Sequence, residues 1–357
     1  METKYLNEWT TELNICIRCG YCLEQCPVFE ATGWETDAPR GRAILAYSIL
    51  TGQLEPSQEV ADKFFQCTYC RDCFERCSAN VSLVDIVSAA RADMVKAGFA
   101  HDAHEYMLDS VKKSGNIFND SEMTTPAKEG EVTVFLGCQF NARLNSAKVY
   151  LNILERLGIK PRLKKEICCG FPLVALGFRE DFEKHKEKFL ELLPDDEVIA
   201  LCPTCAAFLK EEYGKKVKHV IEVIADNIDK LPEANLGTKV TYHDPCDLSR
   251  ELNLIEEPRK ILEKIGVEIV EMPRSKKQSA CCGGGGGMLM TDVNLSAKIS
   301  NGRIHEAVAT DAEMLVTPCP TCEKVLKDAS ATLNKSGEKN IPVRNISSLI
   351  LKALKKT

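Results

Sequence analysis

The chain has 357 residues, 44% of them hydrophobic, which is enough for two or three domains that each bury a core. Its formal net charge of −6 argues against nucleic acid as a partner. No apolar run reaches the roughly 18 residues that a membrane span needs, and the opening METKYLNEWTTELNIC is too polar for a signal peptide. We therefore expect a cytoplasmic protein whose membrane association, if any, comes through a partner protein.

Residues 1–98 predict an α-helical domain. An apolar periodic run at 43–50 follows Pro39 and stops at Gly52, and a second run from Leu83 stops at Gly98. Strand-like alternation is missing from this part of the sequence. The polar residues 99–130 predict a connecting helix and a linker.

Two sets of four cysteines lie in the predicted helical domain: Cys16, Cys19, Cys22 and Cys26, then Cys67, Cys70, Cys73 and Cys77. In each set three cysteines recur at every third residue and the fourth follows four residues later. In two-cluster ferredoxins of this spacing the fourth cysteine binds the other cluster. We therefore assign one [4Fe–4S] cubane to Cys16, Cys19, Cys22 and Cys77, and the other to Cys67, Cys70, Cys73 and Cys26. A four-cysteine zinc site is the alternative, but zinc has no use for the third evenly spaced cysteine.

From residue 131 onward the sequence repeats. In each half an apolar strand leads to a cysteine, then come a helix, a short strand, Cys-Cys-Gly, another helix, and an apolar strand that ends in Cys-Pro-Thr-Cys. We expect strands at 132–136, 198–201, 239–242 and 314–316, helices at 148–157 and 258–265, and closing strand–helix segments at 219–228 and 343–354. This alternation predicts βαβ units and a parallel sheet in each half.

The repeat therefore predicts two α/β domains, residues 131–236 and 237–357, related by a pseudo-twofold axis. Each domain carries five cysteines: Cys138, Cys168, Cys169, Cys202 and Cys205, then Cys246, Cys281, Cys282, Cys319 and Cys322. They follow strands, at the carboxyl ends where open α/β sheets place ligands. All eighteen cysteines thus belong to one of four sets. The size of the chain and the missing signal peptide exclude a secreted disulfide scaffold, so we interpret all four sets as metal ligands.

The duplicated Cys…Cys-Cys-Gly…Cys-Pro-Thr-Cys pattern resembles the cysteine-rich CCG domain of heterodisulfide reductase. With the helical domain included, the whole chain resembles the D-type subunits of that family. The resemblance extends to the C-type subunit of anaerobic glycerol-3-phosphate dehydrogenase and to the iron–sulfur subunit of glycolate or lactate oxidase. It implies a noncubane [4Fe–4S] cluster on each five-cysteine set. Zinc in one of the two sets, the first in particular, remains the alternative.

The resemblance implies an oxidoreductase that passes electrons through two cubanes to two noncubane clusters, which reduce a disulfide such as CoM–S–S–CoB. Cys168, Cys169, Cys281 and Cys282 are then expected at the reacting centres. The alternative is an electron-transfer subunit between a flavoprotein dehydrogenase of the lactate, glycolate or glycerol-3-phosphate type and a quinone or cytochrome. Oxidase-type relatives often lack some CCG cysteines, so the full complement favours the disulfide-reducing class. Because the sequence has no flavin or nicotinamide motif, both functions require a flavoprotein or a membrane cytochrome b subunit as partner.

Two smaller features lie beside the fourth set. Gly283, Gly284 and Gly285 begin a run of five glycines, which predicts close approach of backbone N–H groups to a cluster; a flexible loop is the alternative. His243 precedes Cys246 and is a candidate to protonate a leaving thiolate, or else it only satisfies loop backbone. We expect the remaining histidines at the surface: His101, His104, His185, His219 and His305.

Overall fold

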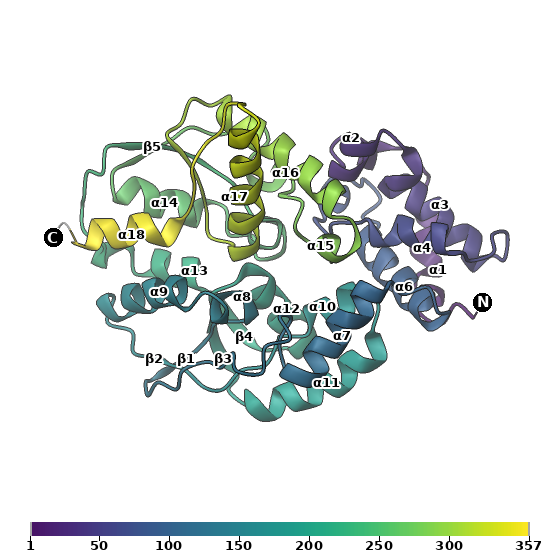
Figure 1. Cartoon of the computed structure of the whole chain (residues 1–357), viewed down its shortest axis with the longest axis horizontal. Coiled ribbons are helices and arrows are strands. Elements are labelled where there is room, and N and C mark those ends of the chain that lie inside the picture. Colours follow the sequence, from purple (N-terminus) through teal and green to yellow (C-terminus); the bar gives the residue numbers. More distant parts are fainter. Residues whose placement is uncertain (1, 356–357) are drawn as a thin grey trace. The chain divides into compact units, whose positions relative to one another are not determined.

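The computed structural model describes residues 2–355 (Figure 1), and they divide into two compact units. The first unit comprises the chain up to Asp109 together with Pro172–Lys184 and Ala280–Ser300. The second comprises Ser110–Phe171, His185–Ser279 and the chain from Asn301 onward. Two short segments, one that follows the first Cys-Cys pair and one that contains the second, therefore pack with the N-terminal region. The predicted domain boundaries themselves stay a prediction.

The regular structure described in the first unit is helical, as predicted. Its helices are α1 (Thr10–Ile15), α2 (Pro27–Thr32), α3 (Pro39–Leu50), α4 (Gln58–Phe65), α5 (Asp72–Glu75), α6 (Leu83–Lys96) and α15 (Met288–Thr291). Four more helices contain a boundary between the units: α7 (Asp102–Ser114), α10 (Phe171–Ala175), α11 (Arg179–Leu192) and α16 (Val293–Val308). Proline at the first position starts both α2 and α3, where its missing N–H costs no hydrogen bond.

Arg91 of α6 ties the three segments of the first unit together. Its fully buried guanidinium donates hydrogen bonds to five backbone carbonyls. The acceptors are Phe64, Phe65 and Cys67 in the N-terminal region, Ala175 in the second segment and Gly286 in the third, at 2.5–2.9 Å. One cation thus satisfies carbonyls from segments that are far apart in the sequence.

The second unit contains two four-stranded sheets, and every strand pair in them is parallel. The first has the order β2-β1-β3-β4, built from β1 (Val132–Phe135), β2 (Pro161–Arg162), β3 (Glu197–Ala200) and β4 (Lys216–His219). The second has the order β6-β5-β7-β8, built from β5 (Thr238–Tyr242), β6 (Val267–Ile269), β7 (Met314–Thr317) and β8 (Val343–Asn345). The identical order, shifted by four strands, confirms the predicted repeat and the α/β fold class.

The helices of the two halves pack against one another reciprocally. The first half contributes α8 (Cys138–Asn141), α9 (Leu144–Arg156), α12 (Pro203–Tyr213) and α13 (Val220–Asp226), and the second contributes a short π-helix η5 (Asp247–Glu251), α14 (Glu256–Lys264), α17 (Pro320–Lys335) and α18 (Ile346–Lys355). Helix α12 packs on η5 and α17 on α8, while α13 packs on α14 and α18 lies beside α9 (Figure 1). Four pairs of helices have equivalent places in the two halves: α8 and η5, α9 and α14, α12 and α17, and α13 and α18. The contact of α12 with η5 is therefore equivalent to that of α17 with α8, and the contact of α13 with α14 to that of α18 with α9. A pseudo-twofold axis produces such pairs of equivalent contacts.

Arg91→Met is expected to lower the free energy of unfolding by roughly 3 kcal/mol or more, since each buried carbonyl left without a donor costs about 1–3 kcal/mol. Urea denaturation followed by circular dichroism under anaerobic conditions measures this loss. Arg344→Met, on an exposed arginine, is the matched control and should stay near wild type. Equal stability of the two variants would contradict the role given to Arg91.

Candidate metal centres

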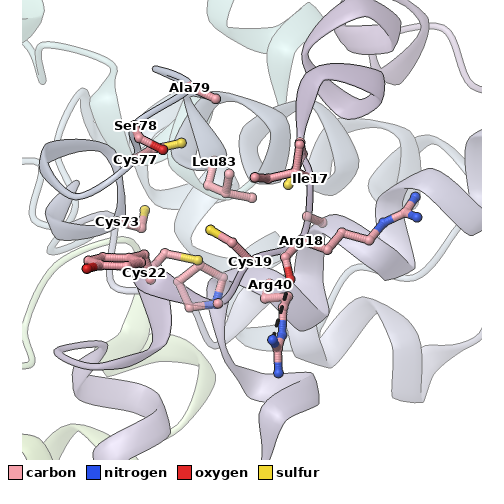
Figure 2. Close-up of a pocket in the computed structure, with 15 residues that line it drawn as sticks. Ile17, Arg18, Cys19, Cys22, Arg40, Cys73, Cys77, Ser78, Ala79 and Leu83 are labelled. Atoms are coloured by element: carbon pink, nitrogen blue, oxygen red, sulfur yellow. Dashed lines mark hydrogen bonds between the residues drawn. The ribbon is translucent and has the colours of Figure 1, made fainter.

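The first two cysteine sets line two separate pockets of the first unit. Cys16, Cys19, Cys22 and Cys77 line a pocket with an empty volume of about 460 Å³. Cys26, Cys67, Cys70 and Cys73 line another of about 300 Å³. Figure 2 shows Cys19, Cys22, Cys73 and Cys77 around the first pocket, so that Cys73 borders both. The grouping is the one that crossed ligand exchange requires, and the assignment of each cysteine as a ligand stays a proposal.

Cysteine–proline pairs place three sulfurs at the N-termini of helices. Cys26, Cys202 and Cys319 are the residues immediately before α2, α12 and α17, and in each case proline is the first helical residue. The Cys26 sulfur accepts a hydrogen bond from the Phe29 amide, and the Cys202 sulfur accepts one from the amide of Cys205. Such positions favour the thiolate, which is the form that binds metal.

Cys77, which lacks the following proline, is held differently. Ser78 and Ala79 continue as a turn, and the Val81 amide donates to the Cys77 sulfur at 3.4 Å. The departure from the usual Cys-Pro pair therefore changes the local backbone but still supplies an N–H group to the sulfur.

Burial opposes ionisation of these thiols when no metal is bound. It raises the pKa of Cys26 to about 11, although the charge of Arg42 favours the thiolate. Burial, together with the neighbouring Cys70 and Cys67, raises the pKa of Cys73 well above its usual range. Several buried thiolates can coexist only if a cation compensates them, so this donor set fits a metal cluster.

The five cysteines of the third set meet inside the second unit. Their sulfurs form a continuous series of contacts: Cys138 with Cys168, Cys168 with Cys169, Cys205 with Cys169 at 3.6 Å, and Cys205 with Cys202. All five are buried. A single centre could therefore use all of them, which is more than a tetrahedral zinc ion needs.

Residues outside the cysteine motif hold this centre in shape. The Glu166 carboxylate accepts hydrogen bonds from the amides of Leu136 and Gly137 at 2.8 and 2.9 Å, directly before Cys138. Burial raises the pKa of Glu166 to about 7, partly offset by these amides. His185 and Tyr213 bind the carbonyls of the Cys-Cys pair: one ring nitrogen lies 2.6 Å from the Cys168 oxygen, and the phenol donates to that of Cys169 at 2.8 Å.

The five cysteines of the fourth set do not all belong to the same unit. Cys246, Cys319 and Cys322 belong to the second unit, where the Cys319 sulfur contacts that of Cys202 in the third set. The two Cys-Pro-Thr-Cys loops therefore touch through sulfur. Cys281 and Cys282 belong to the first unit, where the Cys70 sulfur contacts the Cys281 sulfur. A cysteine of the predicted cubane sets thus contacts a cysteine of the CCG sets.

The glycine run packs against the loop that carries Cys67. A side chain at Gly286, which has φ +60°, would come within 2.4 Å of the Cys67 oxygen, and one at Gly285 within 2.5 Å of the Thr68 oxygen. The Gly283 amide donates to the Cys281 sulfur at 3.3 Å, and Gly284 is half-buried. The run therefore brings backbone very near to the cysteine loops; the cofactor contacts predicted for Gly283, Gly284 and Gly285 stay proposals.

His243 is buried directly beyond β5, with 1% of its surface exposed. Burial, reinforced by the nearby Arg303, lowers its pKa to about 3, so the ring is neutral at neutral pH. Its Nδ1 accepts a hydrogen bond from Arg303 at 3.1 Å. The predicted proton-delivery role stays a prediction.

Sequence patterns did not reveal several residues that support the centres. Glu166, Arg91 and Arg303 lie outside the cysteine motifs, and three of the histidines expected at the surface, His104, His185 and His219, are buried. His104 packs beside Phe65 and bonds Thr291 at 3.0 Å, while His219 bonds the Leu201 carbonyl at 3.0 Å. That expectation was wrong because the partners of these rings are distant in the sequence. Only His305 is exposed, and His101 is partly so.

Comparison with known proteins places this arrangement in a family. Residues 12–81 match the family described as 4Fe-4S dicluster domain, and residues 132–210 and 240–327 each match the cysteine-rich domain CCG. The D-type subunit of the dihydromethanophenazine:CoB–CoM heterodisulfide reductase of Methanosarcina barkeri is 30% identical, covering 96% of this chain and 94% of its own length. The chain belongs to the family of heterodisulfide reductase D-type subunits.

Other relatives of the family differ in the reaction of their complexes. The probable glycolate oxidase iron-sulfur subunit of Bacillus subtilis is 25% identical, covering 87% of each chain. A crystal structure of a hypothetical protein from Helicobacter pylori has a TM-score of 0.64 at 10% identity, covering 100% of this chain and 77% of that one, and shows the fold alone. The chain is thus an iron–sulfur electron-transfer subunit of heterodisulfide reductase type or of a related oxidoreductase. Among residues 2–355, no helix is both long and apolar enough to cross a membrane.

Cys77→Ser is expected to impair the centre that Cys16, Cys19 and Cys22 line, because the fourth ligand crosses over. The electron paramagnetic resonance (EPR) spectrum of the reduced variant should match that of Cys19→Ser, with up to about four irons lost per chain. Cys26→Ser is the matched counterpart and should match Cys70→Ser. The opposite match, Cys77→Ser with Cys70→Ser, would show that the pairing is wrong.

Proposed function

We propose that this chain is the iron–sulfur subunit of a heterodisulfide reductase-like complex. In this proposal it receives electrons from a partner protein at the first two cysteine sets and uses them at the CCG sets to reduce a small-molecule disulfide such as CoM–S–S–CoB. The observation that carries the proposal is the pair of sulfur contacts at the CCG sets. Cys70 contacts Cys281 within the first unit, and Cys202 contacts Cys319 within the second.

The first contact supports a route for electrons. Cys70 is a proposed ligand of a cubane and Cys281 a proposed ligand of a CCG centre. Arg91 reinforces the approach, because it bonds the carbonyls of Cys67 and Gly286 on either side. The glycine run permits the two loops to come this close. In this proposal these residues fix the separation of the two centres within one compact unit.

The second contact supports a paired reaction site. Reduction of a disulfide consumes two electrons and two protons and yields two thiols, so a site that can hold both product sulfurs is useful. When bound, the proposed clusters would supply one-electron carriers and, at the two CCG sets, irons that can take a sulfur ligand. The Cys-Pro-Thr-Cys loops, by touching at Cys202 and Cys319, keep the two sets adjacent. Cys168, Cys169, Cys281 and Cys282 are the proposed anchors of the reacting centres.

A second candidate is the electron-relay function, favoured by the likeness to a glycolate oxidase iron-sulfur subunit. In that case the chain would link a flavoprotein dehydrogenase to a quinone or cytochrome, without a disulfide substrate. The ten cysteines of the CCG sets, all of them present, support the disulfide-reducing function instead. A flavoprotein or a membrane cytochrome b subunit is the proposed partner in both cases.

Anaerobically purified protein is expected to contain about sixteen irons per chain, since four [4Fe–4S] clusters hold four irons each. Metal analysis by mass spectrometry measures iron and zinc together. About twelve irons with one zinc would indicate that one CCG set binds zinc instead of a cluster. About eight irons without zinc would leave both CCG sets empty of cluster and would end the disulfide proposal.

Cys168→Ser and Cys281→Ser are each expected to abolish reduction of CoM–S–S–CoB, because a single remaining centre can hold only one of the two product sulfurs. Reduced viologen dye serves as donor, and the cubane EPR signals of each variant provide the control that electrons still reach the protein. Arg344→Met should keep full activity.

A relay protein gives a different result in the same assay. Wild type would then be inactive with every disulfide tried, yet would pass electrons from a flavoprotein partner to a quinone analogue. One of the two cysteine variants would retain that transfer, since a relay needs a single series of centres.

A further inference from the structure

The two CCG halves differ at the residue three positions before their first cysteine. Phe135 has this position in the first half and His243 in the second. The strand register shows that the two positions are equivalent. Phe135 pairs with Ala200, which is two residues before Cys202. The His243 amide bonds the Val316 carbonyl at 2.9 Å and so lies beside Thr317, which is two residues before Cys319. The same place in the fold is therefore apolar in one half and carries a hydrogen-bonding ring in the other.

The environment of His243 fixes which ring nitrogen carries hydrogen. Arg303, fully buried, donates its Nε–H to Nδ1 of the ring. Arg303 is itself held by Ser279 at 3.1 Å, by the Arg274 carbonyl at 2.9 Å and by the Glu306 carboxylate, so it cannot turn away. Because Nδ1 acts as an acceptor, the hydrogen of the neutral ring is on Nε2.

The backbone around the ring is equally constrained. The Asp244 carboxylate is bound by both terminal nitrogens of Arg259, at 2.8 and 3.0 Å, and by the Lys276 amide at 2.8 Å. These bonds hold the segment between β5 and Cys246. The imidazole therefore has one orientation, set from both its ring and its backbone.

The Nε2 atom of His243 is buried and has no hydrogen-bond partner among the described residues. A buried N–H without an acceptor costs about 1–3 kcal/mol, so we expect a hydrogen-bond acceptor next to Nε2. Within the second unit a ring nitrogen of His243 lies within 4.8 Å of the Cys322 sulfur. Cys322 is a proposed ligand of the second CCG centre, and sulfur that is charged and metal-bound is a good acceptor.

We propose that His243 donates its Nε2–H to sulfur of the second CCG centre and thereby raises the reduction potential of that centre. The proposal rests on the proposed function, which places a cluster on this set. Reduction adds negative charge to the sulfurs, so a hydrogen-bond donor stabilises the reduced form more than the oxidised form. Arg303 is a positioning residue here, because it acts only by orienting the ring.

Three substitutions at His243 test the proposal by redox titration. His243→Asn keeps a side-chain acceptor for Arg303 near the Nδ1 position but removes the donor at Nε2. His243→Gln keeps an amide donor near the Nε2 position, and His243→Phe gives the second half the residue of the first. The EPR signal to be titrated is the one that Cys281→Ser removes.

The donor-free variants His243→Asn and His243→Phe should have a more negative reduction potential. The expected shift is about 59 mV or more for one electron, which is at least a tenfold change in the ratio of oxidised to reduced centre at a fixed potential. His243→Gln should lie closer to wild type. His219→Asn is the matched control, because both nitrogens of that buried ring bind backbone, and should leave this signal unchanged. If His243→Asn loses the centre, His243→Phe serves as the donor-free variant.

Wild-type potential in the donor-free variants overturns the inference and leaves the proposed function intact. Equal shifts in the Asn and Gln variants also overturn it, since the loss would then follow from the altered packing. If wild type has no EPR signal that Cys281→Ser removes, the fourth cysteine set holds no centre of this kind. That result overturns both the proposed function at this set and the inference about His243.

Discussion

A group of thiolates can be buried only if positive charge is buried with it. Twelve of the eighteen cysteines are buried and only Cys19 is exposed, so this condition governs the whole chain. The protein itself contributes partial charges, through helix N-termini at Cys26 and Cys202 and through the Gly283 amide at Cys281. Partial charges cannot balance four or five thiolates, as the raised pKa values of Cys26 and Cys73 indicate. Bound metal therefore stabilises the core, and removal of the metal is expected to destabilise the fold.

The two CCG halves share a backbone plan but stabilise it with different charges. Glu166, two residues before the first Cys-Cys pair, binds amides that precede Cys138. Its counterpart two residues before the second pair is Ser279, which accepts hydrogen bonds from Arg303 and Arg250. A carboxylate acceptor in one half is thus replaced in the other by a serine that binds two guanidinium groups. Duplicated sequence motifs therefore have different hydrogen-bonding groups around them.

Periodicity and cysteine spacing were enough to predict the fold class, because both depend on neighbours in the sequence. The strand that precedes Cys202 was predicted from an apolar run, whereas the helices that follow Cys202 and Cys319, α12 and α17, were not predicted. The packing of Pro172–Lys184 and Ala280–Ser300 with the N-terminal region was not predicted, since it involves hydrogen bonds from Arg91 to two remote carbonyls, those of Ala175 and Gly286. His185 was placed at the surface for the same reason: it lies among charged residues, while its partner is the Cys168 carbonyl. Short-range patterns identify the candidate ligands, and long-range hydrogen bonds decide how they are held.

The hydrogen bond from Arg91 to Gly286 also affects the order in which the protein can be made. It joins residues 195 positions apart, so the N-terminal helices leave the ribosome long before their last acceptor exists. Until residue 286 emerges, the guanidinium lacks part of its set of carbonyls and the loop of Cys67 lacks its glycine neighbours. Local helices form early, whereas contacts of such high sequence separation form late. The segment synthesised first therefore completes the hydrogen bonds of Arg91 only after residue 286 has been synthesised.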